Sequence, residues 1–175
     1  PHDDRVESVL ISEEEIRLRV QEIGRKIESD FAGRPFTIVA VLTGSLIFLA
    51  DVMRRIRIPH QVALMQASSY RGETTTSHEL IINPTLDPDI SGRDVLLIDD
   101  ILDTGKTLSA LERHLKDRGA RSVRTAVLLH KLGCQRIPFE PDYTGFAIPD
   151  RFVVGYGLDY NGDFRHLPYI GVLRP

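Results

Sequence analysis

Residues 95–108 carry the pattern that decides the fold, Val95-Leu96-Leu97-Ile98-Asp99-Asp100-Ile101-Leu102-Asp103-Thr104-Gly105-Lys106-Thr107-Leu108. The apolar start predicts a buried strand over Asp94 to Ile98 that ends in two carboxylates. A small polar loop follows, and then a helix with apolar residues at helical spacing, Leu108, Leu111 and Leu115. Ligands of open α/β sheets bind at the carboxyl ends of strands. The pattern therefore predicts a ligand-binding loop between a strand and a helix.

The loop has the composition of a phosphate site. The first turn of a helix presents unpaired amide groups and a partial positive charge, and both suit a phosphate. We expect Thr104, Thr107 and the backbone around Gly105 to bind a phosphomonoester. Asp99 and Asp100 would then lie where the vicinal hydroxyls of a sugar can donate to them. Paired acids in a loop are often plain solvated surface, but solvation alone explains them poorly directly after an apolar strand.

A nucleotide-triphosphate P-loop is a second interpretation of Gly105-Lys106-Thr107, and the sequence argues against it. That motif requires a glycine five positions before Gly105, where this chain has Asp100. The neighbouring acids would also repel a polyphosphate unless cations lay between them. We therefore reject the P-loop interpretation.

The rest of the chain alternates between strand and helix patterns. Ser12 and Glu15 form a capping box before a helix that closes near Gly33. A second helix is expected from Leu46 until before Pro59, and further apolar runs predict strands over 36–42, 61–67, 79–82 and 123–129. Such alternation predicts a mostly parallel α/β sheet. We expect one domain over 1–175, with a core over about 36–150 and a small hood subdomain from about 1–15 and 151–175.

Composition limits the classes of protein that remain. The chain has 175 residues, a formal net charge of −3 and one cysteine, Cys134, so an internal disulfide framework is excluded. The charge favours neither a nucleic-acid nor an anionic-membrane partner. The apolar segment over 36–50 is too short for a membrane span, and Pro1 to Arg5 lack the pattern of a signal peptide. We expect a cytoplasmic protein.

The strand, the two acids, the two apolar residues and Asp103-Thr104-Gly105-Lys106-Thr107 closely resemble the signature of type I phosphoribosyltransferases that binds phosphoribosyl pyrophosphate (PRPP). Asp103 points to the 6-oxopurine branch of that family. Further segments agree with the bacterial hypoxanthine-guanine enzymes in order and spacing, namely 41–45, Ser69-Tyr70, Lys131, 152–160 and 164–169. The resemblance implies the fold of that family and a purine-salvage enzyme that makes IMP or GMP and releases pyrophosphate.

The resemblance assigns roles on the purine side. Asp103 would be the catalytic group for proton transfer at purine N7, and Lys131 would donate to the exocyclic O6. Phe152 would stack on the base, the backbone of Val153 would contact it, and Asp159 would lie beside it. Plainer interpretations are a helix cap for Asp103, a surface charge for Lys131 and a core position for Phe152. Lys106 of the signature would contribute its backbone amide, with its side chain facing water.

The resemblance also assigns the pyrophosphate side and the metal. Leu42, Thr43 and Gly44 would bind pyrophosphate, with a cis peptide between Leu42 and Thr43, and Arg165 would supply a positive charge. Many relatives carry lysine at the position of Thr43, so this chain has one charge fewer there. Asp159, together with Asp99 and Asp100, would hold Mg²⁺, which suits a pyrophosphate leaving group.

Two expectations concern motion and assembly. The polar segment 68–77, with Ser69 and Tyr70, would close over the site as a lid, the alternative being an ordinary hairpin. The family implies a homodimer or homotetramer, and 46–57 with the pyrophosphate loop is our expected interface. Expected partners are PRPP, a 6-oxopurine base and the nucleoside monophosphate product.

Two rival functions remain open on the same fold. One is a regulator that binds PRPP and a nucleic acid, which would favour a more basic surface than a net charge of −3 provides. The other is a xanthine-preferring enzyme. The preference among hypoxanthine, guanine and xanthine depends on backbone geometry around the base, so the sequence leaves it open.

Overall fold

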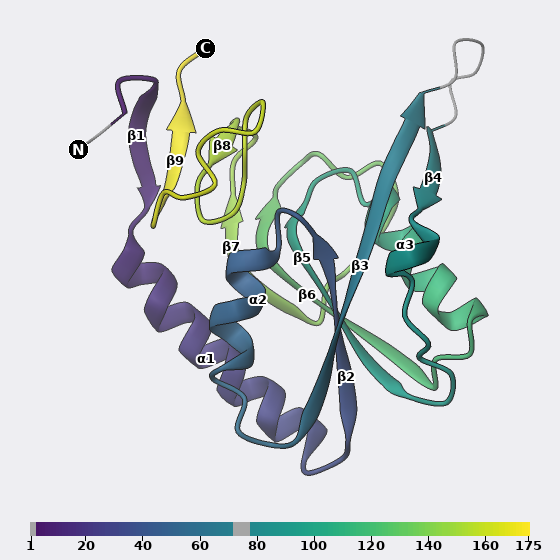
Figure 1. The fold of residues 1–175 in the computed structure, drawn as a ribbon. Coiled ribbons are helices and arrows are strands. Elements are labelled where there is room, and N and C mark those ends of the chain that lie inside the picture. The colour runs from purple at the N-terminus through teal and green to yellow at the C-terminus, as the bar shows by residue number, and fades with distance from the viewer. Residues whose placement is uncertain (1–2, 72–77) are drawn as a thin grey trace.

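The computed structural model describes residues 3–71 and 78–175, and at 69–71 and 78–79 it describes the backbone alone. Within these residues a six-stranded sheet has the order β4-β3-β2-β5-β6-β7 (Figure 1). Its strands are β2 (Phe36–Leu42), β3 (His60–Arg71), β4 (His78–Ile82), β5 (Asp94–Leu102), β6 (Ser122–Lys131) and β7 (Tyr143–Ile148). All neighbours pair in parallel except β3 and β4, which form an antiparallel hairpin. The predicted mostly parallel sheet is confirmed.

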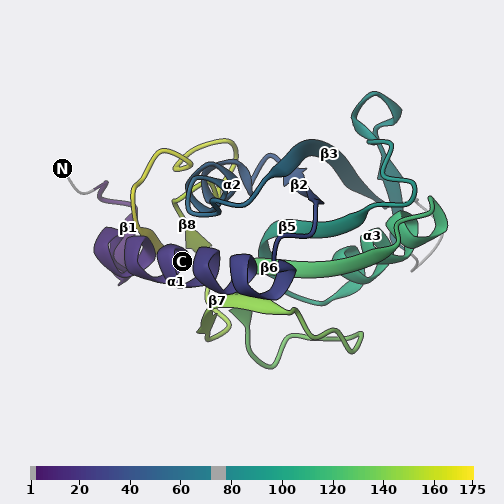
Figure 2. The same cartoon turned by 90° about the horizontal axis from the view of Figure 1, so that it is seen from below.

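Helices cover both faces of this sheet. α1 (Glu13–Phe31) and α2 (Leu46–Met53) lie on one face, and α3 (Lys106–Asp117) lies on the other (Figure 2). Alternate residues of β5 serve the two faces: Leu96 and Ile98 pack with α1 and α2, whereas Val95 and Leu97 pack with α3. A strand buried on both faces must be apolar at every position, which explains the continuous run in the sequence.

The chain ends form a smaller sheet beside the main one. Its strands are β1 (Val6–Ile11), β9 (Ile170–Leu173) and β8 (Val153–Val154), paired antiparallel in the order β1-β9-β8. Val6, Val154, Phe164 and Leu167 form its own buried cluster. In Figure 1 this hood sheet lies at the left and the β3–β4 hairpin at the right, and the carboxyl ends of β2 and β5 face upward between them.

The predicted strand boundaries need correction. β5 continues to Leu102, so Asp99 and Asp100 lie within the strand and not after it. The cause is the neighbouring strand: Asp99 is in register with Val127, and Leu102 is in register with His130. The strands β1, β7 and β9 were not predicted. β7 contains Gly145, and glycine has low strand propensity, but a side chain there would meet the carbonyl oxygen of Leu128 at 2.4 Å.

The start of α1 agrees with the sequence pattern, whereas most of the predicted lid lies outside the described residues. The side chain of Ser12 accepts a 3.1 Å hydrogen bond from the Glu15 amide, which confirms the N-cap of α1. Ser69 and Tyr70 extend β3 and pair with Leu80 and Glu79 of β4. Residues 72–77 and the side chains of Ser69 and Tyr70 lie outside the described part, so the lid stays a prediction. No helix of the described residues is long and apolar enough to cross a membrane.

The packing generates a stability prediction. Ile98 is fully buried, and Ile98→Ala removes buried methyl groups and leaves a cavity. We expect a loss of about 2–5 kcal/mol in the free energy of unfolding, measured by urea denaturation. Leu18→Ala on the exposed face of α1 is the control, because Leu18 is 46% exposed and surface changes cost no more than about 0.5 kcal/mol. Similar losses in the two variants would contradict this account of the core.

Candidate active site

The loop between β5 and α3 forms a shallow cavity at the carboxyl edge of the sheet. Its volume is about 250 Å³, and residues 99–105, 107 and 108 line it. Gly105 is the N-cap of α3 with a φ of 86°, and the Lys106 amide donates a 3.3 Å bond to Oγ1 of Thr104. A Cβ on Gly105 would lie 2.7 Å from the carbonyl oxygen of Ile137, so the position requires glycine. The helix start therefore presents backbone amides to the cavity, as a phosphate site needs.

Asp99 and Asp100 border this cavity and are largely removed from water. Asp99 is 9% exposed, and its carboxylate accepts a 2.8 Å hydrogen bond from the Asp100 amide. Burial raises the pKa of Asp99 well above its usual range, and the neighbouring Asp100 carboxylate adds to the rise. Burial also raises the pKa of Asp100, although hydrogen bonds and the charge of Arg165 oppose that rise. Both carboxylates are therefore costly to ionise until sugar hydroxyls or a cation lie beside them.

The predicted pyrophosphate loop lies against Asp100. The peptide between Leu42 and Thr43 is cis, as predicted. A Cβ on Gly44 would lie 2.0 Å from Oδ2 of Asp100, so a larger residue there would force the Asp100 carboxylate to move. Ser45 holds the turn through a 2.5 Å bond from its hydroxyl to the Val41 carbonyl. Thr43 is exposed, so the loop presents a neutral side chain there.

The residues predicted for the purine side lie in two places: Lys131 and Asp103 meet at the end of β6, and Phe152 and Val153 belong to the hood. Nζ of Lys131 lies 3.7 Å from Oδ2 of Asp103, and the Lys131 side chain is 12% exposed, which argues against a plain surface charge. The N-cap of α3 is Gly105, so Asp103 does not occupy the capping position. Phe152 is 52% exposed and meets Tyr160 edge-on at 5.5 Å between ring centroids, while Val153 is buried. A core role for Phe152 is therefore wrong, because half of the residue is exposed.

Asp159 and Arg165 lie together in the hood. Nη2 of Arg165 is 3.4 Å from Oδ1 of Asp159, and its Nη1 donates a 2.6 Å bond to the carbonyl of Gly157. A Cβ on Gly157 would lie 2.5 Å from the Gly44 carbonyl oxygen, so this part of the hood contacts the pyrophosphate loop. Arg165 is therefore on the side that the resemblance assigns to it.

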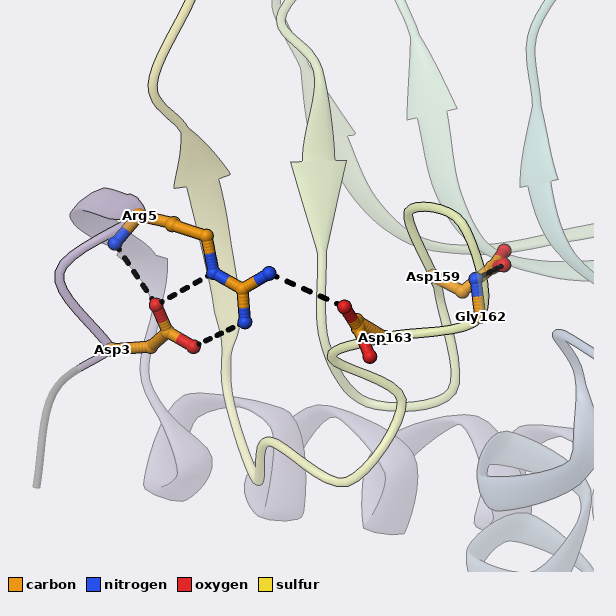
Figure 3. A network of polar contacts seen from close by, with 5 residues as sticks. All are labelled: Asp3, Arg5, Asp159, Gly162 and Asp163. Atoms are coloured by element: carbon orange, nitrogen blue, oxygen red, sulfur yellow. Dashed lines mark hydrogen bonds and ion pairs between the residues drawn. The ribbon is translucent and has the colours of Figure 1, made fainter.

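The Asp159 loop is fixed by its own backbone and by the N-terminal segment. Oδ2 of Asp159 accepts a 2.9 Å bond from the Gly162 amide. Arg5 bridges Asp3 and Asp163, with 2.9 Å to Asp3 and 3.2 Å to Asp163 (Figure 3). The Arg5 guanidinium also lies 4.4 Å from the centroid of the Phe164 ring. These contacts hold the loop that carries Asp159 against the hood sheet.

The predicted metal residues do not form a complete site by themselves. Among residues 3–71 and 78–175, no three metal-binding side chains come together. The donor set of Asp99, Asp100 and Asp159 is nevertheless made of carboxylate oxygens, which Mg²⁺ prefers. This ion usually takes one or two carboxylates, and substrate phosphates and water complete its shell. The residues therefore fit a metal that arrives with pyrophosphate.

Sequence reasoning missed two contacts of the site. Asp150, on the loop after β7, lies with Oδ1 3.9 Å from Nζ of Lys131. The buried Tyr156 donates a short hydrogen bond to Asp51 of α2, which ties the hood to the helix after the pyrophosphate loop. Gly155, Tyr156 and Gly157 all have positive φ. The two glycines around a tyrosine were the available signal for that turn, whereas nothing near Asp150 indicated its partner.

The buried acids generate a pH prediction. Because the pKa of Asp99 is raised above its usual value of 3.8, ionisation destabilises the folded state, and the penalty grows as the pH rises above that value. Asp99→Asn removes the penalty and keeps an oxygen for the Asp100 amide. We expect a higher melting temperature for the metal-free variant, with a larger gain at pH 8 than at pH 5. Each kcal/mol should give about 2–4 °C. If Asp99→Asn has a lower melting temperature than the wild type at pH 8, this electrostatic account is refuted.

Comparison with known proteins agrees with this geometry. The sequence model of one protein family, the phosphoribosyl transferase domain, matches residues 10–161. A hypoxanthine-guanine phosphoribosyltransferase of Bacillus subtilis is 43% identical over 174 residues, which are 99% of this chain and 96% of that protein. The bifunctional protein TilS/HprT of Listeria innocua is also 43% identical over 99% of this chain, but the chain spans 27% of its length.

The structural comparison gives the same answer. The crystal structure of a hypoxanthine phosphoribosyltransferase from Staphylococcus aureus superposes with a TM-score of 0.92 at 40% identity. The match covers 98% of this chain and 94% of that one. The family fold predicted from the sequence is thereby confirmed. The chain belongs to the phosphoribosyltransferase family.

Proposed function

We propose that the protein is a purine-salvage enzyme that transfers the 5-phosphoribosyl group of PRPP to N9 of hypoxanthine or guanine. The products are IMP or GMP and pyrophosphate. The observation that carries this proposal is the 3.7 Å approach of Lys131 to Asp103, an acid of the loop between β5 and α3. The hypoxanthine-guanine phosphoribosyltransferase of Bacillus subtilis, 43% identical along nearly its whole length, supports the same activity.

The reaction separates charge, and the residues around the ribose would stabilise the charges that develop. The bond between C1′ and the pyrophosphate oxygen breaks toward an oxocarbenium-like transition state, and the purine attacks from the opposite face. The amides at the start of α3, with Thr104 and Thr107, would bind the 5′-phosphate. Asp99 and Asp100 would accept hydrogen bonds from the ribose hydroxyls and stabilise the developing positive charge. Arg165 and the loop around Gly44 would hold the departing pyrophosphate.

On the opposite face of the ribose, Asp103 and Lys131 would handle the base. Asp103 would accept the proton that leaves purine N7 as the new bond to N9 forms. Lys131 would donate a hydrogen bond to O6. A 6-amino group could not take the place of O6, because it does not accept a hydrogen bond from Lys131. A buried donor left without an acceptor costs about 1–3 kcal/mol, so this contact selects 6-oxopurines over adenine.

Mg²⁺ would supply neutralisation of the negative charge on pyrophosphate. Asp159, with Asp99 and Asp100, would hold it on the protein side. The fixed position of Asp159, bonded to the Gly162 amide, means that this carboxylate needs little rearrangement to bind.

We also propose the wider context of the chain. Residues 1–175 would be one phosphoribosyltransferase domain with a core over 36–150 and a hood from 1–15 and 151–175. The absence of a disulfide partner for Cys134 in the sequence supports a cytoplasmic location. Residues 46–57 would join copies into a homodimer or homotetramer, since Leu46 and Ile47 are 46% and 36% exposed. The chain matches both stand-alone enzymes and part of a bifunctional protein, so these statements concern this segment.

An assay with separate bases tests the activity. The purified protein, PRPP and Mg²⁺ should convert hypoxanthine or guanine, and adenine should give no product. Asp103→Asn should lower kcat by roughly 10²–10⁴-fold, the usual contribution of a positioned acid–base group. Asp117→Asn, an exposed acid at the end of α3, is the matched control. No turnover of any purine, with PRPP binding retained, would contradict the proposal and favour the regulator.

The base contact has its own test. Lys131→Met should raise the KM for hypoxanthine roughly 10- to 100-fold, because a hydrogen bond to a charged donor contributes about 1.5–3 kcal/mol. The KM for PRPP should not change. Lys116→Met, on the exposed face of α3, removes the same charge far from the site. An equal rise of KM for both substrates would show that Lys131 does not read the base.

A further inference from the structure

The ammonium group of Lys131 lies between two carboxylates, and the family resemblance uses one of them. Nζ is 3.7 Å from Oδ2 of Asp103 and 3.9 Å from Oδ1 of Asp150. The lysine side chain is 12% exposed, whereas the side chains of Asp103 and Asp150 are 51% and 75% exposed. Asp150 has no role in the mechanism described above. Because it lies beside Lys131, the residue proposed to bind the base, it could affect base binding.

The backbone fixes Asp150 in this place. Lys131 is in register with Ile148 across the β6–β7 pair, and the Leu132 amide donates a 2.9 Å bond to the Ile148 carbonyl. A turn follows in which the Arg151 amide donates a 2.8 Å bond to the Pro149 carbonyl. Asp150 lies in that turn, so its carboxylate reaches Lys131 without a mobile loop. It also shares a cavity of about 370 Å³ with Asp103 and with Thr104, Gly133, Cys134, Gln135 and Arg136.

The two distances indicate how the acids act. Charge-assisted N–H···O bonds are about 2.7–2.9 Å long, so at 3.7 and 3.9 Å neither acid has closed a hydrogen bond with the ammonium. If Asp103 were the sole anion, it would draw Lys131 into a closed ion pair, which would compete with purine N7 for Asp103 and with O6 for Lys131. The carboxylate of Asp150 attracts the Lys131 ammonium from a second side and so opposes its movement toward Asp103. The ammonium, which has three donors, can then keep one of them for O6.

We propose that Asp150 is a positioning residue that holds Lys131 apart from Asp103 and directed at O6 of the purine. This inference rests on the proposed function and adds a residue that determines recognition of the 6-oxo group. An exposed ion pair contributes little to stability, so the effect of Asp150 should appear in base binding and not in folding.

The test compares Asp150→Asn with Glu140→Gln, an exposed acid of the β6–β7 connection whose loss changes the net charge equally. For Asp150→Asn we expect the KM for hypoxanthine and guanine to rise roughly 3- to 10-fold, as for the loss of about 1 kcal/mol. The KM for PRPP and the melting temperature should match those of the wild type. Glu140→Gln should leave all four values unchanged. An unchanged KM for the bases, or an equal rise for PRPP, would overturn the proposal.

A second comparison asks whether Asp150 acts through Lys131. In a Lys131→Met background, Asp150→Asn should have no further effect on base binding, because the group that it positions is gone. A persisting effect of the same size would overturn the proposal. Calorimetric binding of IMP to each variant gives a readout that does not depend on turnover. Wild-type protein that neither converts hypoxanthine nor binds IMP would instead contradict the proposed function itself.

Discussion

The parallel register between β5 and β6 is the constraint on which the candidate site depends. Leu102 is in register with His130, so the residues that follow, Asp103 and Lys131, emerge side by side at the carboxyl edge. The same edge carries Asp99, Asp100 and the start of α3. A shift of one residue between these strands would turn buried side chains to the opposite face and separate the two charged groups. The apolar residues of β5, buried on both faces, hold the register.

A second set of contacts couples the hood to this edge. Gly157 lies against Gly44, Gly44 lies against Asp100, and Tyr156 bonds to Asp51 of α2. A Cβ on Gly157 would meet the backbone of Gly44, and one on Gly44 would meet the Asp100 carboxylate, so both positions favour glycine. The buried acids at this junction are destabilising in the protein alone, because their charged forms have lost water. The site therefore lowers the stability of the protein alone, and bound substrate groups and a cation would offset this cost.

Much of the fold and the site could be predicted from sequence because the decisive signals are local. The apolar run of β5, the loop at Gly105 and the leucines of α3 lie within one short stretch, and the pattern of each is interpretable alone. The strands β1 and β9 were missed because they pair with each other from opposite ends of the chain, and β7 was missed because Gly145 interrupts its pattern. The extension of β5 over Asp99 and Asp100 depends on β6, and the place of Asp150 depends on a turn. No local pattern encodes such contacts.

The central claim is that one edge of the sheet binds both the phosphate and the 6-oxo group of a purine nucleotide. The most direct measurement is a crystal structure of the protein with IMP. We predict the phosphate on the backbone amides of residues 104–107, and O6 within about 2.7–3.2 Å of Nζ of Lys131. A phosphate bound elsewhere, or a purine whose O6 lies away from Lys131, would contradict the account.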